Sequence, residues 1–310
     1  MTTIRLTRTT CLAAHCAATI GFFDGVHRGH LFLLEQLKQL AAGQGLQSMV
    51  VTFDRHPRQV VQPDWQPLLL STLEEKEQLL AQTGIDTLVV LPFDEQMAAL
   101  SAFAFMRQVL KAQLGVDLLL TGYDNHFGHR QGNIAEGFDD YADYGSKLGI
   151  DVVCGQPLIE AGTTVSSSYI RQLLGEGRVK EAARCLGRSY ELQGTVEHGR
   201  QQGRKMGFPT ANLALQRTDC VVPRRGLYVV RAEACGKTWK GMTNIGMRPT
   251  FNGHRQTIET HLLDFSGDLY GQPLRIAFME RLRDERRFDS PDELARQMAL
   301  DAQRCREIEC

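Results

Sequence analysis

The sequence of 310 residues lacks the features that mark several large classes of protein. Its eight cysteines form no C-x-x-C pair, and their scattered spacing resembles neither a disulfide framework nor a zinc site. No apolar run approaches the ~20 residues that a membrane-spanning helix needs. The N-terminus has no basic segment followed by an apolar core and a cleavage site. We therefore expect a cytoplasmic protein with reduced thiols and no membrane partner.

Charge of either sign is not in excess. Lysine and arginine number 35 against 36 aspartates and glutamates, which gives a formal net charge of −1. This balance argues against a broad surface for nucleic acid, although local basic clusters remain compatible with it. The chain also lacks solenoid repeats and low-complexity segments, and its length suffices for two domains of ordinary size.

The first half of the chain repeats one unit. Apolar, β-branched runs begin roughly 30 to 40 residues apart, near residues 19, 48, 87, 116 and 150. Helical patterns lie between most of them, for example over 103–110 and 137–148. Strands that are buried on both faces and alternate with helices predict a parallel sheet of βαβ units. In such a sheet a ligand binds beyond the carboxyl ends of the strands.

The polar segment 24–30 follows the first of these runs and contains an H-x-G-H motif. A turn at Asp24 leads into a helix, so the two histidines fall where free N–H groups and the helix dipole favour anions. His27 and His30 could both face one phosphate chain. From the motif alone, a pair of histidines that faces phosphate is as well supported as a solvated loop histidine followed by a helix-start histidine.

Further polar segments follow the later runs, at 54–57, 121–128 and 166–171. The last contains three adjacent serines, followed by Arg171. By themselves these residues are most simply a helix N-cap and a solvated charge. Beside the histidines, they suggest the second half of a triphosphate clamp.

The pattern changes near residue 184, where we place a domain boundary. Beyond it, short strands joined by glycine-rich connections predict a small antiparallel barrel. These strands are expected over 191–196, 226–234, 238–245, 257–265 and 274–280. An amphipathic helix capped at 290–293 follows, with Leu294, Met298 and Ala302 on one face.

Residues 194–212 combine glycines with basic side chains. Gly199, Gly203 and Gly207 stand four residues apart, with Lys205 and two arginines between them. Glycines permit close backbone approach and the basic groups can meet phosphate. On their own these residues are also typical of a mobile hairpin whose charges aid solubility.

Pro209 is followed by two polar residues at alternate positions, Thr210 and Asn212. In an extended segment both side chains project from one face. A hydroxyl and an amide so placed can help to hold Mg²⁺ and a nucleotide.

The segment 256–265 is expected to be a strand, in which alternation places Glu259 on the same face as His261, Leu263 and Phe265. A carboxylate among large apolar groups lies either at an exposed strand end or in a reactive site. The pattern supports an exposed strand end and a reactive site equally.

Five motifs in order resemble those of the bacterial bifunctional riboflavin kinase/FAD synthetase family. Residues 21–30 resemble its G-x-F-D-G-x-H-x-G-H motif, and residues 166–171 resemble its S-S-T-x-I-R segment. Residues 207–212 match the G-F-P-T-A-N of its kinase, and 244–251 and 259–265 follow as in that family. The resemblance covers nearly the whole chain and spans the expected boundary.

The resemblance implies an α/β fold in two domains. Residues 1–184 would be a Rossmann-like parallel-sheet nucleotidyltransferase domain, and 185–310 a small antiparallel β-barrel kinase domain with a C-terminal helix. The kinase would phosphorylate riboflavin with ATP to give FMN. The first domain would adenylylate FMN with a second ATP to give FAD and pyrophosphate. The implied partners are these small-molecule substrates with Mg²⁺ as the default metal and no nucleic acid, and no oligomeric state follows.

The resemblance also implies roles for individual residues. His27 and His30 would donate hydrogen bonds to the phosphates of ATP, and Glu259 would be the base for the riboflavin hydroxyl. The substrate-binding residues of the first domain would be Gly21, Phe23, Asp24, Gly29, Asp124, Ser167, Ser168 and Arg171. Those of the kinase would be Gly199, Gly203, Lys205, Gly207, Pro209, Thr210 and Asn212. Thr210 and Asn212 would also engage Mg²⁺.

The sequence departs from the family pattern at three places. Residues 124–128 read D-N-H-F-G where D-F-R-F-G is common, Phe22 replaces a usual asparagine, and Ser168 replaces a threonine. The first departure removes an aromatic and an arginine, which leads to one alternative, a riboflavin kinase whose adenylyltransferase domain is impaired. Two others are a nucleotidyltransferase for another phosphorylated acceptor and a non-catalytic flavin sensor.

Overall fold

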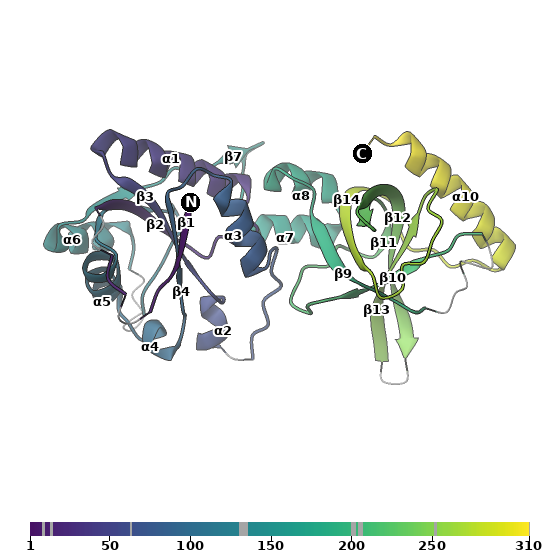
Figure 1. The fold of residues 1–310 in the computed structure, drawn as a ribbon, viewed down its shortest axis with the longest axis horizontal. Coiled ribbons are helices and arrows are strands. Elements are labelled where there is room, and N and C mark those ends of the chain that lie inside the picture. Colours follow the sequence, from purple (N-terminus) through teal and green to yellow (C-terminus); the bar gives the residue numbers. More distant parts are fainter. Residues whose placement is uncertain are drawn as a thin grey trace. The chain divides into compact units, whose positions relative to one another are not determined.

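The structure is a computed structural model that describes residues 1–7, 10–12, 15–62, 64–129, 136–199, 203, 207–250 and 253–309 (Figure 1). Residue contacts divide the chain into two compact units, Met1–Ser167 and Ser168–Cys310. In the described part of the chain, no helix is long and apolar enough to cross a membrane.

Unit 1 is built on a six-stranded sheet with the order β1-β4-β3-β2-β5-β6, in which every pair is parallel. The strands are β1 (Thr2–Arg5), β2 (Cys16–Ile20), β3 (Gln47–Phe53), β4 (Thr87–Leu91), β5 (Val116–Thr121) and β6 (Asp151–Cys154). The predicted parallel sheet is therefore confirmed. The edge strand β1 was not predicted, because its four residues are mostly polar and exposed.

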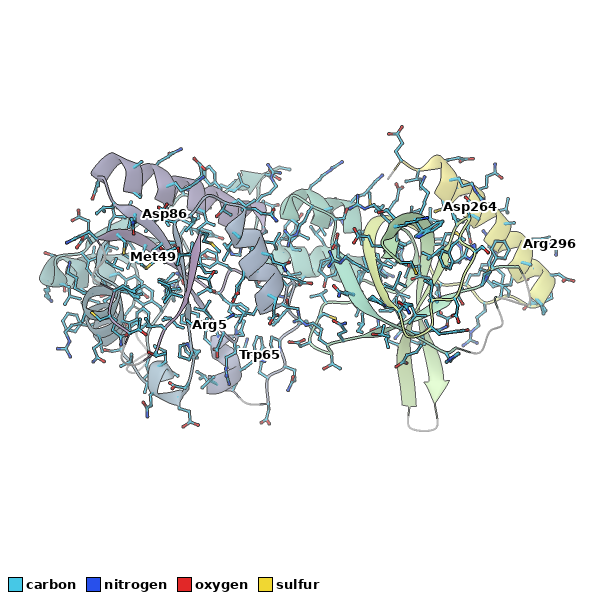
Figure 2. All side chains as sticks on the ribbon, in the orientation of Figure 1. Arg5, Met49, Trp65, Asp86, Asp264 and Arg296 are labelled. Carbon is cyan, nitrogen blue, oxygen red and sulfur yellow. The ribbon has the colours of Figure 1, made fainter. Side chains whose placement is uncertain are left out.

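Both faces of this sheet are buried. Met49 (Figure 2) belongs to one apolar cluster and its neighbour Val50 to the other, as alternation along a strand requires. The covering helices are α1 (Arg28–Gln44), α2 (Pro57–Val61), α3 (Leu73–Ala81), α4 (Glu95–Ala98), α5 (Ala102–Phe105), η1 (Met106–Gln113) and α6 (Phe138–Leu148). A short hairpin of β7 (Ile159–Glu160) and β8 (Thr163–Thr164) follows β6.

The predicted helix over 103–110 is confirmed, and the structure adds that most of it is π-helical. Its first turn, α5, is α-helical and is capped by the Ser101 hydroxyl, and the remaining turns form the π-helix η1. Apolar periodicity does not distinguish a π-helical segment from an α-helical one, since both bury one stripe of side chains. The predicted helix over 137–148 is confirmed as α6.

The order of the strands defines a switch point at β2. The chain runs outward through β3 and β4 on one side of β2, and then through β5 and β6 on the other. Ligands of such sheets bind beyond the carboxyl ends of the strands at this point. The segments after β2 and β5 therefore lie where a substrate site is expected.

Unit 2 is a closed antiparallel barrel with the order β10-β13-β12-β11-β14-β9, which confirms the predicted barrel. Its strands are β9 (Glu191–Glu197), β10 (Ala211–Leu215), β11 (Gly226–Ala234), β12 (Lys237–Thr250), β13 (Gly253–Leu262) and β14 (Pro273–Arg283). Among the described residues of the second half, the structure has the helices α7 (Ser167–Glu176), α8 (Val179–Leu186) and α10 (Pro291–Glu307).

Helices α7 and α8 pack with the barrel. The Arg224 N–H donates to the Leu174 carbonyl at 2.9 Å, and Lys180 pairs with Glu280 of β14 at 2.5 Å. The division by contacts, between Ser167 and Ser168, therefore falls at the start of α7, and the boundary near residue 184 stays a prediction.

A buried ion pair holds α10 to the barrel. Asp301, 2% exposed, accepts hydrogen bonds from Arg283 Nη2 at 2.7 Å and from Gln297 Nε2 at 3.0 Å. A more exposed pair joins Asp264 (Figure 2) to Arg306 at 3.0 Å. As predicted, the helix begins at a cap, in which the Ser290 hydroxyl accepts from the Glu293 N–H at 3.2 Å.

We expect Asp301→Ala to lower the free energy of unfolding by about 3 kcal/mol, because it leaves a partly buried guanidinium without its carboxylate. Asp264→Ala, which removes a carboxylate that is 76% exposed, should cost less than about 1 kcal/mol. Urea unfolding measures both values. Equal losses in the two variants would contradict a special role for the buried pair.

Candidate active sites

The loop between β2 and α1 is held in an unusual backbone conformation. Phe23 and Val26 have φ angles of 53° and 38°, which non-glycine residues seldom adopt. The buried Asp24 carboxylate accepts hydrogen bonds from the Leu70 N–H at 2.9 Å and the Ser71 N–H at 3.2 Å. The structure thus places Asp24 in contact with the 70–71 backbone, where it fixes the loop.

His27 is the N-cap of α1, and His30 lies in the first turn, as the sequence predicts. The His27 Nδ1 atom accepts a hydrogen bond from the His30 backbone N–H at 3.2 Å, so a neutral His27 ring carries its proton on Nε2. The two rings stack with centroids 3.6 Å apart. Two imidazoles are therefore brought together at a positive helix terminus, a place that favours phosphate.

The environment of His30 keeps its ring neutral. Burial, with smaller contributions from His27 and Lys76, holds its pKa well below the usual 6.5. Phe23 packs against it with ring centroids 5.1 Å apart. Among the described residues its buried Nδ1 atom has no hydrogen-bond partner. A polar atom orphaned in this way calls for a partner that the chain does not supply, which fits a bound substrate.

The depressed pKa of His30 gives a sign for the dependence of stability on pH. Below pH 6.5 the unfolded chain takes up a proton that the folded chain does not, so the free energy of unfolding falls as the pH is lowered. The slope from this group is at most about 1.4 kcal/mol per pH unit. Urea unfolding between pH 7 and 5 should give a shallower slope for His30→Gln than for the wild type. Equal slopes would contradict a depressed pKa.

Glycines and a serine surround the first turn of α1. A Cβ atom on Gly29 would lie 2.5 Å from the Val165 carbonyl oxygen, so only glycine permits this approach. Gly21 lies against the Phe23 ring, which its Cβ would meet at 3.1 Å. Ser167 donates a hydrogen bond to the Asp24 carbonyl at 3.0 Å.

Helix α7 carries the remaining predicted residues of the first site. It begins at Ser167, and Ser168 and Arg171 follow within its first turns. Helical spacing puts the three side chains on one face.

An aromatic cleft of 860 Å³, here called the strand-end cleft, lies at the carboxyl ends of β2, β3 and β4 and in the segment after β5. The aromatic side chains that line it are Phe22, Phe53, His56, Phe93, Phe105, His126, Phe127 and His129. Trp65 (Figure 2) packs against His56, with ring centroids 4.7 Å apart. Such walls suit a flat aromatic ring.

The residues after β5 that depart from the family pattern make contacts that explain them structurally. The Asn125 Nδ2 atom donates to the Ile20 carbonyl at 2.5 Å, which ties this segment to β2 at the switch point. Phe127 stacks on Tyr141 with centroids 4.3 Å apart and lines the cleft. Asp124, a predicted binding residue, is exposed, and it is not among the residues that line the cleft.

In the barrel, strand register assembles a polar row that single-strand patterns cannot reveal. Asn212 of β10 lies opposite Glu197 of β9 and Glu259 of β13, and Glu259 lies opposite Asn244 of β12. Residues directly opposite one another project from the same face of a sheet. The sequence predicted Asn212 and Glu259 but missed Glu197 and Asn244, because register depends on which strands pair.

Two clefts meet at Thr210. The α10 cleft, 250 Å³, has Glu259, His261 and Asn244 among its polar lining residues. Its apolar side chains are Leu227, Met242, Phe288, Leu294 and Met298. A second cleft of 520 Å³, the 265–270 cleft, is lined by Pro209 and by that loop. Thr210 lines both, so two ligands could approach each other there.

The prediction that Glu259 shares a face with Phe265 is wrong. It holds for His261, which lines the same cleft, and for Leu263, which packs with Leu227 and Met242 of that cleft. Strand β13 ends at Leu262, and Asp264 has a φ angle of 60° that turns the chain. Leu263 packs in the core beneath α10, and Phe265 lines the 265–270 cleft. Alternation applies only within a strand, and the sequence does not mark where this strand stops.

The described glycines before β10 differ in their surroundings, and only Gly199 is shown beside the polar row. A Cβ on Gly199 would lie 2.2 Å from Asn212 Nδ2, and one on Gly203 would lie 2.3 Å from the Phe208 carbonyl oxygen. Gly207 has a φ angle of 81°, which favours glycine. The predicted phosphate-binding residue Lys205 lies outside the described residues.

The donor set can be tested against Mg²⁺. No three histidine, cysteine, aspartate or glutamate side chains of the described residues gather as a metal cluster. Mg²⁺ commonly takes only one or two protein ligands and shares the phosphates of its substrate. A hydroxyl at Thr210 and an amide oxygen at Asn212, beside the Glu259 carboxylate, fit that requirement.

A parallel sheet with an H-x-G-H turn at its switch point, joined in one chain to a barrel with two clefts, defines a two-site transferase of phosphate-bearing groups. The family model for FAD synthetase matches residues 11–169, and that for riboflavin kinase matches residues 186–309. The bifunctional riboflavin kinase/FMN adenylyltransferase of Escherichia coli (strain K12) is 39% identical over 295 residues, covering 94% of this chain and 92% of that protein.

The protein of the same description from Bacillus subtilis (strain 168) is 37% identical over 294 residues, covering 94% of this chain and 91% of its own. A solved structure of a macrolide-efflux protein from Streptococcus pneumoniae superposes with a TM-score of 0.88 at 29% identity, over 100% of both chains.

The chain belongs to the bifunctional riboflavin kinase/FMN adenylyltransferase family. It is an ATP-dependent transferase that phosphorylates riboflavin and adenylylates FMN. Because both domains are matched, this two-activity reading is supported over a kinase with an impaired adenylyltransferase domain.

Proposed function

We propose that FAD is formed at the β2–α1 turn. A phosphate oxygen of FMN attacks the α-phosphorus of ATP, the bond to the bridging oxygen of the β-phosphate breaks, and pyrophosphate leaves. The His27 Nε2–H, the neutral His30 ring and the N-terminus of α1 stabilise the charge that builds on the phosphate oxygens. The orphaned Nδ1 atom of His30, buried beside a second imidazole, is the observation that carries this assignment.

The same proposal gives the surrounding residues their roles. Ser167 contacts the turn through the Asp24 carbonyl, and Ser168 and Arg171 keep the phosphate-binding roles that the family resemblance implies. The strand-end cleft receives the flavin ring, because aromatic side chains line it. Asp24, Gly21, Phe23 and Gly29 act by fixing the turn, as their backbone contacts and close approaches support.

We propose that FMN is formed where the two barrel clefts meet. The apolar α10 cleft takes riboflavin and the 265–270 cleft takes ATP, so the reacting groups approach each other beside Thr210. Glu259 accepts the proton of the 5′-hydroxyl as its oxygen attacks the γ-phosphorus, and ADP leaves. The glycines at 199, 203 and 207, with Lys205, close over the phosphates, and Pro209 lines the nucleotide side.

Thr210 and Asn212 would hold Mg²⁺ together with the ATP phosphates. The metal supplies positive charge that neutralises the phosphate oxygens. The near-zero net charge supports small-molecule substrates without nucleic acid or membrane partners, and the scattered cysteines support a cytoplasmic location.

A product time course tests the proposed function. With riboflavin, ATP and Mg²⁺, we expect FMN to rise first and then to be converted to FAD with release of pyrophosphate. FMN that accumulates without FAD would favour the impaired adenylyltransferase. Flavin binding without release of ADP or pyrophosphate would favour a sensor.

A further inference from the structure

A lysine that has no role in the proposed reaction steps lies buried beneath the β2–α1 turn. Lys76 of α3 is 3% exposed. Its ammonium donates to the Phe22 carbonyl at 3.0 Å, to the Thr52 hydroxyl at 3.0 Å and to the Phe53 carbonyl at 3.1 Å. These three acceptors match the three protons of an ammonium group, so one side chain joins the first turn of the site to the end of β3.

The surroundings of Lys76 combine apolar cover with charge. The Phe22 ring lies over its ammonium, with Nζ 4.3 Å from the ring centroid. Asp24 in the turn, Asp54 after β3 and Glu77 on α3 act on it as negative charges, and its own field acts on His30 of α1. Burial nevertheless dominates, and lowers the pKa of Lys76 to about 8.

We propose that Lys76 is a positioning residue for adenylyl transfer, which anchors the H-x-G-H turn through the Phe22 carbonyl and directs a buried positive charge at the phosphate site. The proposal rests on the assignment of FAD formation to His27 and His30. Lys76 itself touches no substrate, because its three protons are committed to the chain.

The geometry explains why a buried cation is useful here. The Phe22 carbonyl precedes a turn in which two non-glycine residues have positive φ, so an anchor at this point limits how the turn can relax. The positive charge disfavours a second proton on His30, and it attracts the charge that develops on the α-phosphoryl group and on pyrophosphate. A charge in a low-dielectric interior acts more strongly than one in water.

FAD formation should therefore depend on the protonated form of Lys76. Activity from this group is present below about pH 8 and is lost as the pH rises above that value. Loss of stability through Lys76 does not account for that decline. Between about pH 8 and 10.5 the unfolded lysine still binds its proton and the folded lysine does not. The free energy of unfolding therefore rises with pH in that window.

The experiment measures FAD formation from supplied FMN and FMN formation from riboflavin between pH 7 and 9.5. In the wild type, we expect the rate of FAD formation to fall as the pH rises through about 8. The rate of FMN formation should show no such alkaline limb. Lys76→Met should lower the rate of FAD formation at pH 7 roughly tenfold and flatten that limb. Lys76→Arg, whose guanidinium stays charged, should remain active to higher pH than the wild type.

Lys147→Met removes a lysine that is 59% exposed and serves as the matched control. It should keep the rate and the pH profile of the wild type. If Lys76→Met fails to fold, the pH profiles of FAD formation in Lys76→Arg and in the wild type still test the role of Lys76. A wild-type profile for FAD formation that is flat from pH 7 to 9.5 overturns the proposal, as does an unshifted limb in Lys76→Arg. If FAD forms normally in His30→Ala, the site assignment fails instead.

Discussion

Replacing His30 by alanine slows FAD formation from supplied FMN by about 30- to 1,000-fold, which corresponds to about 2–4 kcal/mol of transition-state stabilisation. The variant removes a neutral imidazole whose buried Nδ1 atom has no partner in the described chain. FMN formation from riboflavin should keep its wild-type rate, because the kinase residues belong to the barrel. Separate assays of the two half-reactions, each started from its own substrate, measure both rates.

His15→Ala is the matched control for this variant. His15 lies before β2, at the amino end of the sheet, and its side chain is 86% exposed and bonded to Asp117. It should leave both half-reactions unchanged. A thermal melt checks that His30→Ala is folded, since this ring packs against Phe23 and His27. Equal slowing of both half-reactions in a folded His30→Ala would contradict the assignment.

Replacing Glu259 by glutamine has the reverse effect. The amide keeps the shape of the side chain but is a far weaker proton acceptor, so FMN formation should fall roughly 100- to 10,000-fold. FAD formation from supplied FMN should be unaffected. Rates of ADP release with riboflavin and of pyrophosphate release with FMN separate the two outcomes.

Glu280→Gln provides the control in the barrel. Glu280 of β14 pairs with Lys180 and lines neither barrel cleft. Its replacement should change neither rate. A Glu259→Gln variant that phosphorylates riboflavin at the wild-type rate would exclude this carboxylate as the base.

Much of the first site could be predicted from the sequence because its signals are local. A strand, a turn and a helix start are written in consecutive residues, so the positions of His27 and His30 on α1 follow from the pattern. The rule that parallel strands end at one edge then joins segments far apart in the chain. The residues that line the strand-end cleft confirm it for the segments 54–57 and 121–128, which meet residues 20–22 there.

What could not be predicted depends on tertiary packing. Lys76 carries no local signal, since a lone lysine in a helical pattern is normally exposed. The row from Glu197 to Asn244 depends on which barrel strands pair and in what register. The apolar pattern of the sequence marks neither the π-helical turns of η1 nor the end of β13 at Leu262.

The central claim is that one chain holds two separate ATP sites, and that the FMN made at one is the nucleophile at the other. Complementation between the two variants tests it most directly. Neither His30→Ala nor Glu259→Gln alone should convert riboflavin to FAD at an appreciable rate. An equimolar mixture should do so, as FMN released by the first variant is adenylylated by the second. A mixture that forms no FAD, although each variant retains its remaining half-reaction, would contradict the claim.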